Sequence, residues 1–450
     1  MSDDSGPQMP DLGGLLEQAQ KMQEQMAAAQ AGAAAQVIEG QAGGGVVRIE
    51  VTGALEFRSV TIEPAAVDPD DVEMLQDLVL AALHDAVARA NEIQAGAMGG
   101  VDLGNILKHK GTEIIALCDV DRNRLQAAAK RVPGARTYTD WRELLAKEGE
   151  RVDSINASVP DHMHAAIAMT ALRAGKHVYC QKPLCHDVAE VRALRELTAK
   201  SGKITQLGTQ HASGIGDRMA VEYLRNGAIG KIKHVYLGSN RSGIEQFRKV
   251  GPRPQDSAAP PAHLDWDLWT GNAPLRGFVP GIYHPAKWRS WQDFGTGWSG
   301  DIGCHIFDAV WKGLGFGNVS AKSVHAKVNE TWKNDPARNT DSWAPSNLIT
   351  WIFPGNEMTE RDEITFQWFD GEFYPPEDVQ ALAPGKFPEE FAMLIGTEGA
   401  LLLPHTSGPR LLPREKFAST PRPKPKPRNH YHHFLDACLG TAKNESDFGQ

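Results

Sequence analysis

The stretch VDSINASVPDHMHAAIAMTALRAGKHVYCQKPL, residues 152–184, decides the fold of most of this 450-residue chain. Its pattern predicts a strand over 152–158, a helix over 161–174 and a second strand over 177–180, because short apolar runs flank a longer helical segment. A strand, a helix and a further strand in this order form a βαβ unit with two parallel strands. The stretch therefore predicts an α/β fold.

The same alternation continues on both sides of this unit. Before it we predict a buried strand over 113–119 and a helix over 122–131, and after it a helix over 188–200 and a strand over 203–207. These elements predict most of a Rossmann-like, doubly wound parallel sheet. Beyond residue 210 we predict an α+β domain with a mostly antiparallel sheet, whose elements are a helix over 217–225 and strands over 233–239, 347–353 and 363–369.

The first hundred residues differ in kind from the rest. They contain 16 Asp and Glu against 4 Lys and Arg, whereas the remaining residues contain 40 against 43. Their apolar spacing predicts a small α+β module of helix, strands and helix. Its elements are an amphipathic helix over 12–26, a strand over 47–51, a second strand that ends at 62, and a helix from about 71 to 96. We therefore expect three domains, over 1–100, 101–210 and 211–450.

Composition excludes several classes of protein. With 41% hydrophobic and 23% charged residues, the chain has the composition of a globular protein rather than a disordered one. No apolar run approaches the ~20 residues of a membrane span. The acidic start lacks the basic and apolar regions of a secretory signal, so we expect a cytoplasmic protein. The five cysteines include no C-x-x-C pair, which indicates free thiols.

Three segments of the first hundred residues carry a resemblance to a known family. LLEQAQKMQEQM, VTGALEFRSVTIEP and DVEMLQDLVLAALHDAVARANE resemble the YbaB/EbfC nucleoid-associated family over about residues 8–98. The resemblance implies a homodimer and DNA binding at the nucleoid. Phosphate contacts depend on Lys and Arg, and this segment offers Lys21, Arg48, Arg58 and Arg89. A dimerisation module without DNA contact therefore stays equally open.

Three ordered motifs in the rest of the chain carry a second resemblance. SVPDHMH (158–164), YCQKPL (179–184) and GDIGCH (300–305) resemble the Gfo/Idh/MocA oxidoreductase family over about 104–440, and HLDWDLWTGNAP points to its planctomycete-type members. The resemblance implies an NAD(P)-dependent dehydrogenase that moves a hydride to or from a hydroxyl carbon of a sugar or cyclitol.

The candidate catalytic residues are Lys182, Asp301 and His305. Asp301 and His305 are four residues apart, so on a helix they share a face, where a carboxylate can orient an imidazole that transfers protons near neutral pH. Lys182 follows a strand and would project from the carboxyl edge of the sheet. The resemblance implies that Lys182 binds the reacting hydroxyl and that His305 is the acid/base or its close partner.

The candidate cofactor-binding residues lie at strand ends. Asp119 closes the strand over 113–119, where an acid binds the adenosine ribose and repels the 2′-phosphate of NADP, so we expect NAD. Asp121 is the alternative, and either residue can instead cap a helix. The resemblance implies that the loop with Pro160 and His164 packs against the cofactor. It also places Gln181 where the family usually has Glu.

No metal site is expected. His430, His432 and His433 have no carboxylate or cysteine at ligand spacing, and they precede a helical segment. The tryptophans between 266 and 298 can stack a sugar ring or pack a loop onto the sheet, and we favour packing.

The family's first strand and Gly-rich turn have no counterpart, because no apolar strand precedes Gly96, Gly99, Gly100 and Gly104. We expect the first βα unit to be missing. A literal G-x-G-x-x-G at Gly295, Gly297 and Gly300 follows no buried strand, so we interpret it as part of the substrate pocket. Two alternatives stay open, a DNA-binding dimer with a silent oxidoreductase remnant and a non-catalytic sugar-binding protein.

Overall fold

The computed structural model describes residues 37–52, 56–68, 71–95, 98–241, 251–284, 287–383 and 385–449. The chain divides into two compact units. The N-terminal unit comprises residues up to Gln41 and Val46–Gly96, and the large unit comprises Ala42–Gly45 and Ala97–Gln450. The predicted helix over 12–26 lies outside the described residues. Within the described residues, no helix is long and apolar enough to cross a membrane.

The N-terminal unit contains a three-stranded sheet and a long helix. The strands follow one another in the order β1 (Val37–Ala42), β2 (Val47–Thr52) and β3 (Phe57–Ile62), and α2 (Val72–Ala95) packs against β2. The predicted alternation in β2 is confirmed, since Val47, Ile49 and Val51 are fully buried. Strand β1 was not predicted because its segment is rich in Ala and Gly. A Cβ at Gly40 would lie 2.2 Å from the backbone nitrogen of Ala86, so this close approach requires glycine.

Five short parallel strands of the large unit form two separate sheets. They are β4 (Ala116–Cys118), β5 (Arg136–Tyr138), β6 (Ser154–Ala157), β7 (His177–Cys180) and β8 (Thr205–Leu207). Strand β4 pairs with β5, and β6, β7 and β8 form the other sheet in that order. Rossmann-like parallel strands are therefore confirmed, but in two sheets instead of one.

Strand β4 differs from the buried strand that we predicted over 113–119. It is three residues long, and its last residue, Cys118, is exposed. The physical reason is the missing neighbour, because among the described strands β4 pairs with β5 alone. A strand with one open edge leaves backbone groups without ladder partners and accessible to solvent on that side.

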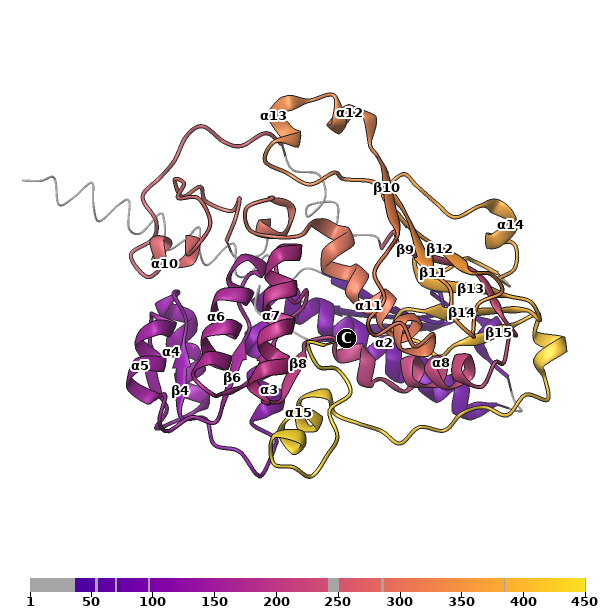
Figure 1. Ribbon diagram of the computed structural model, residues 1–450, viewed down its shortest axis with the longest axis horizontal. Coiled ribbons are helices and arrows are strands. Elements are labelled where there is room, and N and C mark those ends of the chain that lie inside the picture. Colours follow the sequence, from indigo (N-terminus) through magenta and orange to yellow (C-terminus); the bar gives the residue numbers. More distant parts are fainter. Residues whose placement is uncertain are drawn as a thin grey trace, which may run out of the picture. The chain divides into compact units, whose positions relative to one another are not determined.

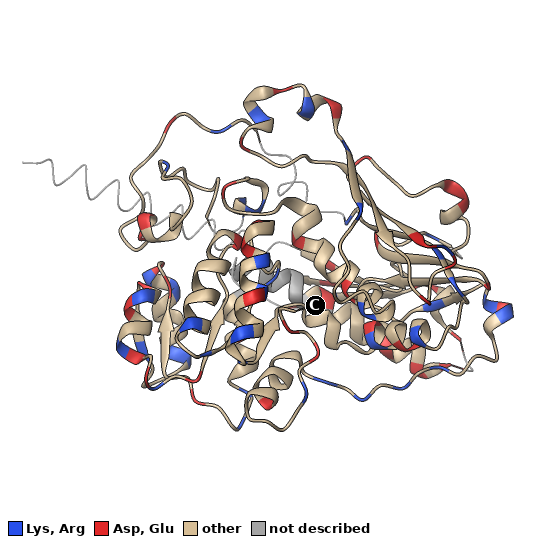
Figure 2. Ribbon diagram, in the orientation of Figure 1, with Lys and Arg blue, Asp and Glu red and all other residues tan. Residues whose placement is uncertain are grey.

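Helices accompany these strands, and those over 122–131, 161–173 and 188–201 match predicted helices, whereas those over 98–106 and 141–148 were not predicted. The helices are α3 (Met98–Ile106), α4 (Arg122–Arg131), α5 (Trp141–Glu148), α6 (Asp161–Arg173), α7 (Val188–Ser201) and, near the end of the chain, α15 (His430–Cys438). Helices α6 and α7 lie side by side, and α6 covers β6 and β7 (Figure 1). The charged residues of helix α4 are all basic, whereas α5 carries charges of both signs (Figure 2), and charged residues are usual on solvated helix faces.

A seven-stranded sheet follows, with the order β10-β11-β12-β9-β13-β14-β15. The strands are β9 (Ile232–Ser239), β10 (Ser323–Val328), β11 (Asn347–Pro354), β12 (Glu363–Asp370), β13 (Glu390–Gly396), β14 (Ala400–Pro404) and β15 (Arg410–Leu412). Only β12 and β9 pair in parallel, so the predicted mostly antiparallel sheet is confirmed.

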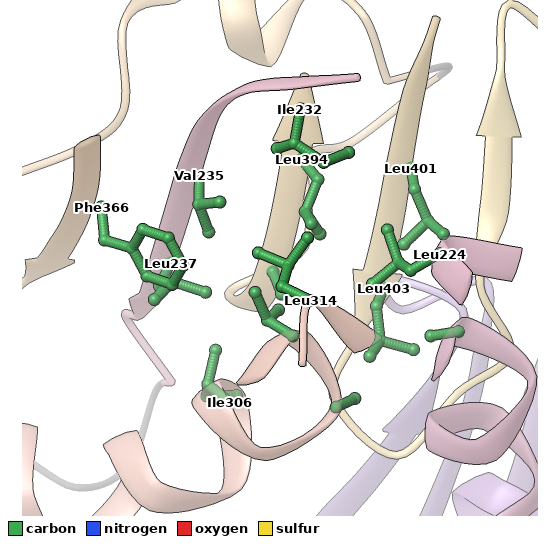
Figure 3. Close-up of a cluster of buried hydrophobic side chains, with 14 of the residues drawn as sticks. Leu224, Ile232, Val235, Leu237, Ile306, Leu314, Phe366, Leu394, Leu401 and Leu403 are labelled. Atoms are coloured by element: carbon green, nitrogen blue, oxygen red, sulfur yellow. The ribbon is translucent and has the colours of Figure 1, made fainter. Parts of the chain in front are cut away.

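Two helices, α8 (Ile215–Arg225) and α11 (Gly297–Gly313), pack on this sheet and against each other. Between them and the strands lies a continuous apolar core, in which Val235, Leu237, Phe366 and Leu394 are fully buried (Figure 3). This packing fixes the two helices rigidly on the sheet, and α11 carries two of the predicted site residues.

The segment before α11 is rich in Trp and contains α10 (Trp266–Thr270) and the short 3₁₀ helix η3 (Lys287–Ser290). All five tryptophans named in this region are at most 7% exposed; they are Trp266, Trp269, Trp288, Trp291 and Trp298. Their burial supports packing over stacking on a sugar. The remaining short helices are α12 (Glu330–Lys333), α13 (Pro336–Asn339) and α14 (Glu377–Gln380).

Candidate active site

Lys182 and Asp301 form a buried ion pair. Lys182 lies two residues beyond the end of β7, and Asp301 lies in the second turn of α11. The Lys182 Nζ donates to the Asp301 backbone oxygen at 2.8 Å and to its Oδ1 at 2.7 Å. Burial would lower the pKa of Lys182, but the Asp301 carboxylate raises it. The structure thus brings together two of the three predicted catalytic residues.

Arg289 and Asp161 complete this ionic cluster, and sequence reasoning missed both. The Arg289 Nε donates to Asp301 Oδ1 at 3.2 Å, and its guanidinium lies 4.4 Å from the Trp288 ring centroid. Burial acts to raise the pKa of Asp301, yet Lys182 and Arg289 lower it to about 2. Asp301 is therefore ionised at neutral pH.

Asp161, the first residue of α6, holds the start of α11. Its Oδ2 accepts hydrogen bonds from the Thr296 backbone nitrogen at 3.1 Å and from Thr296 Oγ1 at 3.0 Å. Its Oδ1 is buried without a hydrogen-bond partner among the described residues. Burial and the nearby Asp301 charge raise the pKa of Asp161 to about 7. Asp161 lies within the motif SVPDHMH. Its contact with Thr296 joins residues far apart in the sequence, so the local sequence does not predict it.

His305 lies one helical turn beyond Asp301 and is 7% exposed. Its ring centroid is 5.2 Å from that of His211 and 5.6 Å from that of His405. Burial, followed by the Lys182 charge, lowers the pKa of His305 well below its usual value. We expected Asp301 to orient this ring, but the hydrogen bonds of its carboxylate go to Lys182 and Arg289. A cation pair competes better for a carboxylate than a neutral imidazole does.

His164 connects two loops of the site. It is fully buried, and its Nδ1 lies 2.7 Å from the Pro183 oxygen while its Nε2 lies 2.8 Å from the Val159 oxygen. Burial lowers its pKa to about 4. Pro160 precedes α6 at the N-cap position. His164 therefore ties the loop after β6 to the Lys-Pro turn, and direct contact of Pro160 or His164 with a cofactor stays a prediction.

Gln181 lies in a hydrogen-bond network centred on Asp102 of α3, which sequence reasoning also missed. The Gln181 Nε2 donates to Asp102 Oδ1 at 2.9 Å and to Oδ2 at 3.0 Å. The Tyr431 hydroxyl donates to Oδ1 at 2.8 Å, and the Ser158 hydroxyl donates to Oδ2. Asp102 is fully buried, and burial raises its pKa. This carboxylate thus joins α3, the ends of β6 and β7, and α15.

Asp119 stands at the carboxyl end of β4, as predicted, and is half-buried. Its Oδ1 accepts a hydrogen bond from the Asp121 backbone nitrogen at 2.9 Å, and burial raises its pKa. Asp121 caps α4, because its side chain accepts from the backbone nitrogens of Asn123 and Arg124. Of the two candidate acids, Asp119 is therefore the one not used as a helix cap.

The glycines of the literal G-x-G-x-x-G lie at the start of α11, after η3. Gly297 has φ +71°, which favours glycine, and a Cβ at Gly295 would lie 2.7 Å from the Arg289 Cα. Gly295 thus allows the Arg289 backbone to lie close to the start of α11, and a pocket-shaping role of these glycines stays a prediction.

No group of three or more His, Cys, Asp or Glu residues able to hold a metal occurs in the described part of the chain. His430 instead uses its ring within the fold, since Nε2 lies 2.8 Å from the Leu207 oxygen and Nδ1 lies 2.8 Å from Ser213 Oγ.

Comparisons with known proteins find family matches over three stretches of the chain. Residues 9–105 match the YbaB/EbfC DNA-binding family. Residues 93–209 match the oxidoreductase family model for the NAD-binding Rossmann fold, and residues 221–341 match the model for its C-terminal alpha/beta domain.

Curated relatives cover the N-terminal part. A nucleoid-associated protein of Nocardia farcinica is 51% identical over 89 residues, which are 20% of this chain and 81% of that protein. A nucleoid-associated protein of Mycobacteroides abscessus is 49% identical over 90 residues, 20% of this chain and 79% of that protein.

Solved structures cover the rest. The WlbA dehydrogenase of Bordetella pertussis, in complex with NADH and UDP-GlcNAcA, aligns with a TM-score of 0.52 at 17% identity over 78% of this chain and 88% of that chain. The Chromobacterium violaceum WlbA dehydrogenase gives the same TM-score at 16% identity, over 78% and 86% of the two chains. At these identities the likeness concerns the fold.

Proposed function

The chain belongs to the YbaB/EbfC family over its first hundred residues and to the Gfo/Idh/MocA oxidoreductase family beyond them, and from this premise we propose an NAD-dependent dehydrogenase that acts on a hydroxyl carbon of a sugar or cyclitol. The observation that carries the proposal is the buried Lys182–Asp301 pair with His305 one turn away on α11.

Lys182 binds and polarises the substrate hydroxyl in this proposal. Two of the hydrogen-bond donors on its Nζ go to Asp301, which leaves one donor for a substrate oxygen. Asp301 keeps the ammonium charged and aimed, and an ammonium next to the developing alkoxide stabilises that charge. His305 accepts the hydroxyl proton at a ring nitrogen. Bound NAD supplies the hydride acceptor.

The residues present fit the cofactor in part. Asp119 follows β4, where we propose that it binds the adenosine ribose and disfavours a 2′-phosphate, and the loop with Pro160 and His164 lies at the carboxyl end of β6. The turn that binds the pyrophosphate in this family lies in the first βα unit. Here the parallel strands form two separate sheets, β4-β5 and β6-β7-β8, instead of one. We propose that this unit is lost and that the cofactor binds weakly.

A calorimetric titration of NADH and NADPH into the full chain, followed by turnover assays with sugars and cyclitols, tests this function. We expect NADH to bind more tightly than NADPH and at least one polyol to be oxidised. Sugar binding without any cofactor binding would instead identify a sugar-binding protein. No binding of either kind by the folded chain would identify a silent remnant.

DNA binding is the second candidate function, and membership of the first hundred residues in the YbaB/EbfC family favours it. Two arginines of the described part of the N-terminal unit lie beside glutamates. Arg48 lies 2.9 Å from Glu63 Oε1, and Arg58 lies 3.6 Å from Glu56 Oε2. A gel mobility shift with a salt titration tests DNA binding independently of catalysis.

A further inference from the structure

Two buried polar atoms on neighbouring helices lack hydrogen-bond partners among the described residues. They are Nδ1 of His305 on α11 and Oδ2 of Asp217 on α8. The two residues are 7% and 6% exposed. Leaving a buried polar group unpaired costs about 1–3 kcal/mol, so each of these two atoms needs an explanation.

Both residues line one small pocket. Its other lining residues are Ile306, Ala392, Leu403 and His405. The pocket lies where α8 and α11 pack against each other and against β13 and β14. A carboxyl oxygen and an imidazole nitrogen are thus the unpaired groups of the same enclosed, largely apolar space, where a hydrogen bond is strengthened by the low dielectric constant.

We propose that Asp217 is a positioning residue whose carboxylate turns toward His305 and hydrogen-bonds to Nδ1, a bond that neither atom makes in the described arrangement, and so fixes the ring for proton transfer. This proposal deepens the function proposed above and rests on it for the role of His305. It also gives His305 an orienting partner in place of Asp301, whose carboxylate hydrogen-bonds to Lys182 and Arg289. A general base needs such a partner to set its ring orientation and tautomer.

The number of protons that Asp217 and His305 hold together decides whether His305 can accept or donate a proton. With one proton, Nδ1–H donates to the Asp217 carboxylate, and the Nε2 lone pair is free to accept the proton of a substrate hydroxyl. With two protons, the pair keeps a hydrogen on Nε2, which can return a proton to an alkoxide when a ketone is reduced. The same pair therefore serves both directions of a dehydrogenase, and its titration belongs to the pair.

A simpler explanation of Asp217 is its position in the first turn of α8, where acids favour the helix dipole. That interaction works for an exposed carboxylate and requires no burial. It leaves Oδ2 unpaired inside the protein, whereas a bond to His305 satisfies both atoms at once. Burial and the nearby Asp308 charge raise the pKa of Asp217, which makes an isolated buried carboxylate still less favourable.

The ring is otherwise surrounded by cationic or neutral groups. The titratable groups that act on His305 from the packed elements are Lys182, His211, His405 and His430, and those that act on Asp217 are Asp308 and Lys312. Within these sets Asp217 is the one acidic group that lines the pocket with His305.

The test uses the full chain labelled with ¹⁵N-histidine, in which His305→Gln identifies the ring signals of His305. We expect Asp217→Asn to move these signals and to change their pH dependence. Asp308→Asn is the matched control, because it removes a carboxylate of the same neighbourhood that pairs with Lys312 at 2.9 Å and does not line the pocket. Unchanged His305 signals in Asp217→Asn, or equal changes in Asp308→Asn, overturn the proposal.

Kinetics gives a second readout. We expect Asp217→Asn to lower kcat by about 10-fold to 100-fold with a small change in KM, since a positioning residue contributes less than the ~10²–10⁴ of a general acid or base. Asp217→Glu keeps a carboxylate at this position and should therefore retain more of kcat than Asp217→Asn. The ring signals decide the inference even in a chain without turnover, so the absence of dehydrogenase activity and the absence of an Asp217–His305 bond are distinguished.

Discussion

Asp161 and Asp301 are two buried carboxyl groups in one site whose pKa values shift in opposite directions. The pKa of Asp301 falls to about 2 because Lys182 and Arg289 outweigh its burial, whereas burial and the Asp301 charge raise the pKa of Asp161 to about 7. Two groups whose pKa values differ in this way can hold different protonation states at one pH. At neutral pH one carboxylate anchors the lysine, and the other is poised to gain or lose a proton.

Replacing Lys182 separates its chemical role from its structural role. We expect Lys182→Ala to reduce kcat by at least about 10²-fold, because the substrate oxygen loses its cationic donor. The melting temperature should change little, since Arg289 still neutralises Asp301. Lys147→Ala, which removes an exposed lysine paired with Glu143 on α5, is the control and should leave both quantities unchanged. An unfolded Lys182→Ala would mark the lysine as structural.

The raised pKa of Asp161 also makes a prediction about stability. The folded protein holds this proton up to about pH 7, whereas the unfolded chain releases it near its usual 3.8, so the folded state binds more protons in between. The contribution of Asp161 to the free energy of unfolding should therefore fall as pH rises from about 4 to 7, by about 1.4 kcal/mol per pH unit. Urea unfolding at several pH values should show this slope in the wild type and a flatter one in Asp161→Asn. Identical slopes would contradict the buried, protonated carboxyl.

At the scale of elements, one carboxylate connects four segments distant in sequence. Asp102 on α3 accepts hydrogen bonds from Gln181 after β7, Ser158 after β6 and Tyr431 on α15. In an intact Rossmann sheet a central strand would supply cohesion between such segments through its backbone. Here side-chain hydrogen bonds to Asp102 supply part of it.

Removing this carboxylate should weaken the whole network. We expect Asp102→Ala to lower the free energy of unfolding by about 2–5 kcal/mol, because it leaves the buried donors of Gln181 and Tyr431 unpaired. Asp153→Ala, at an exposed carboxylate before β6, should change it by less than about 0.5 kcal/mol. Denaturant unfolding of the two variants measures the difference. Equal stabilities would show that the network does not hold the segments together.

Sequence patterns predicted the elements of this fold better than its contacts. Helix α4 and strand β7 occupy the predicted residues, because a strong period and clear caps are local properties. Strand β1 escaped notice in an Ala/Gly-rich stretch. Asp102, Asp217 and Arg289 escaped because single polar residues acquire meaning only from distant partners. Ordered motifs predicted Lys182 and Asp301 as site residues, but the structure pairs Asp301 with Lys182 and not with the imidazole of His305 as expected.

At the scale of the whole molecule, the chain combines two families with opposite charge. The first hundred residues hold 16 acidic and 4 basic residues, and residues 101–450 hold 43 Lys and Arg. DNA binding by the N-terminal module alone can therefore use few cations, two of which lie beside glutamates. This distribution limits how strongly DNA binding can depend on salt.

Each phosphate contact contributes about −0.9 to the slope of log K against log salt, so four cations per chain predict a slope no steeper than about −3.6 per chain. We expect a mobility-shift titration between low and moderate salt to give weak binding within this limit. Arg58→Ala should reduce the slope by about one contact if this arginine reaches DNA, while Arg173→Ala, in the oxidoreductase part at the end of α6, should not. A steeper slope that Arg58→Ala leaves unchanged would show that DNA contacts the oxidoreductase part, because only that part has enough Lys and Arg to produce it.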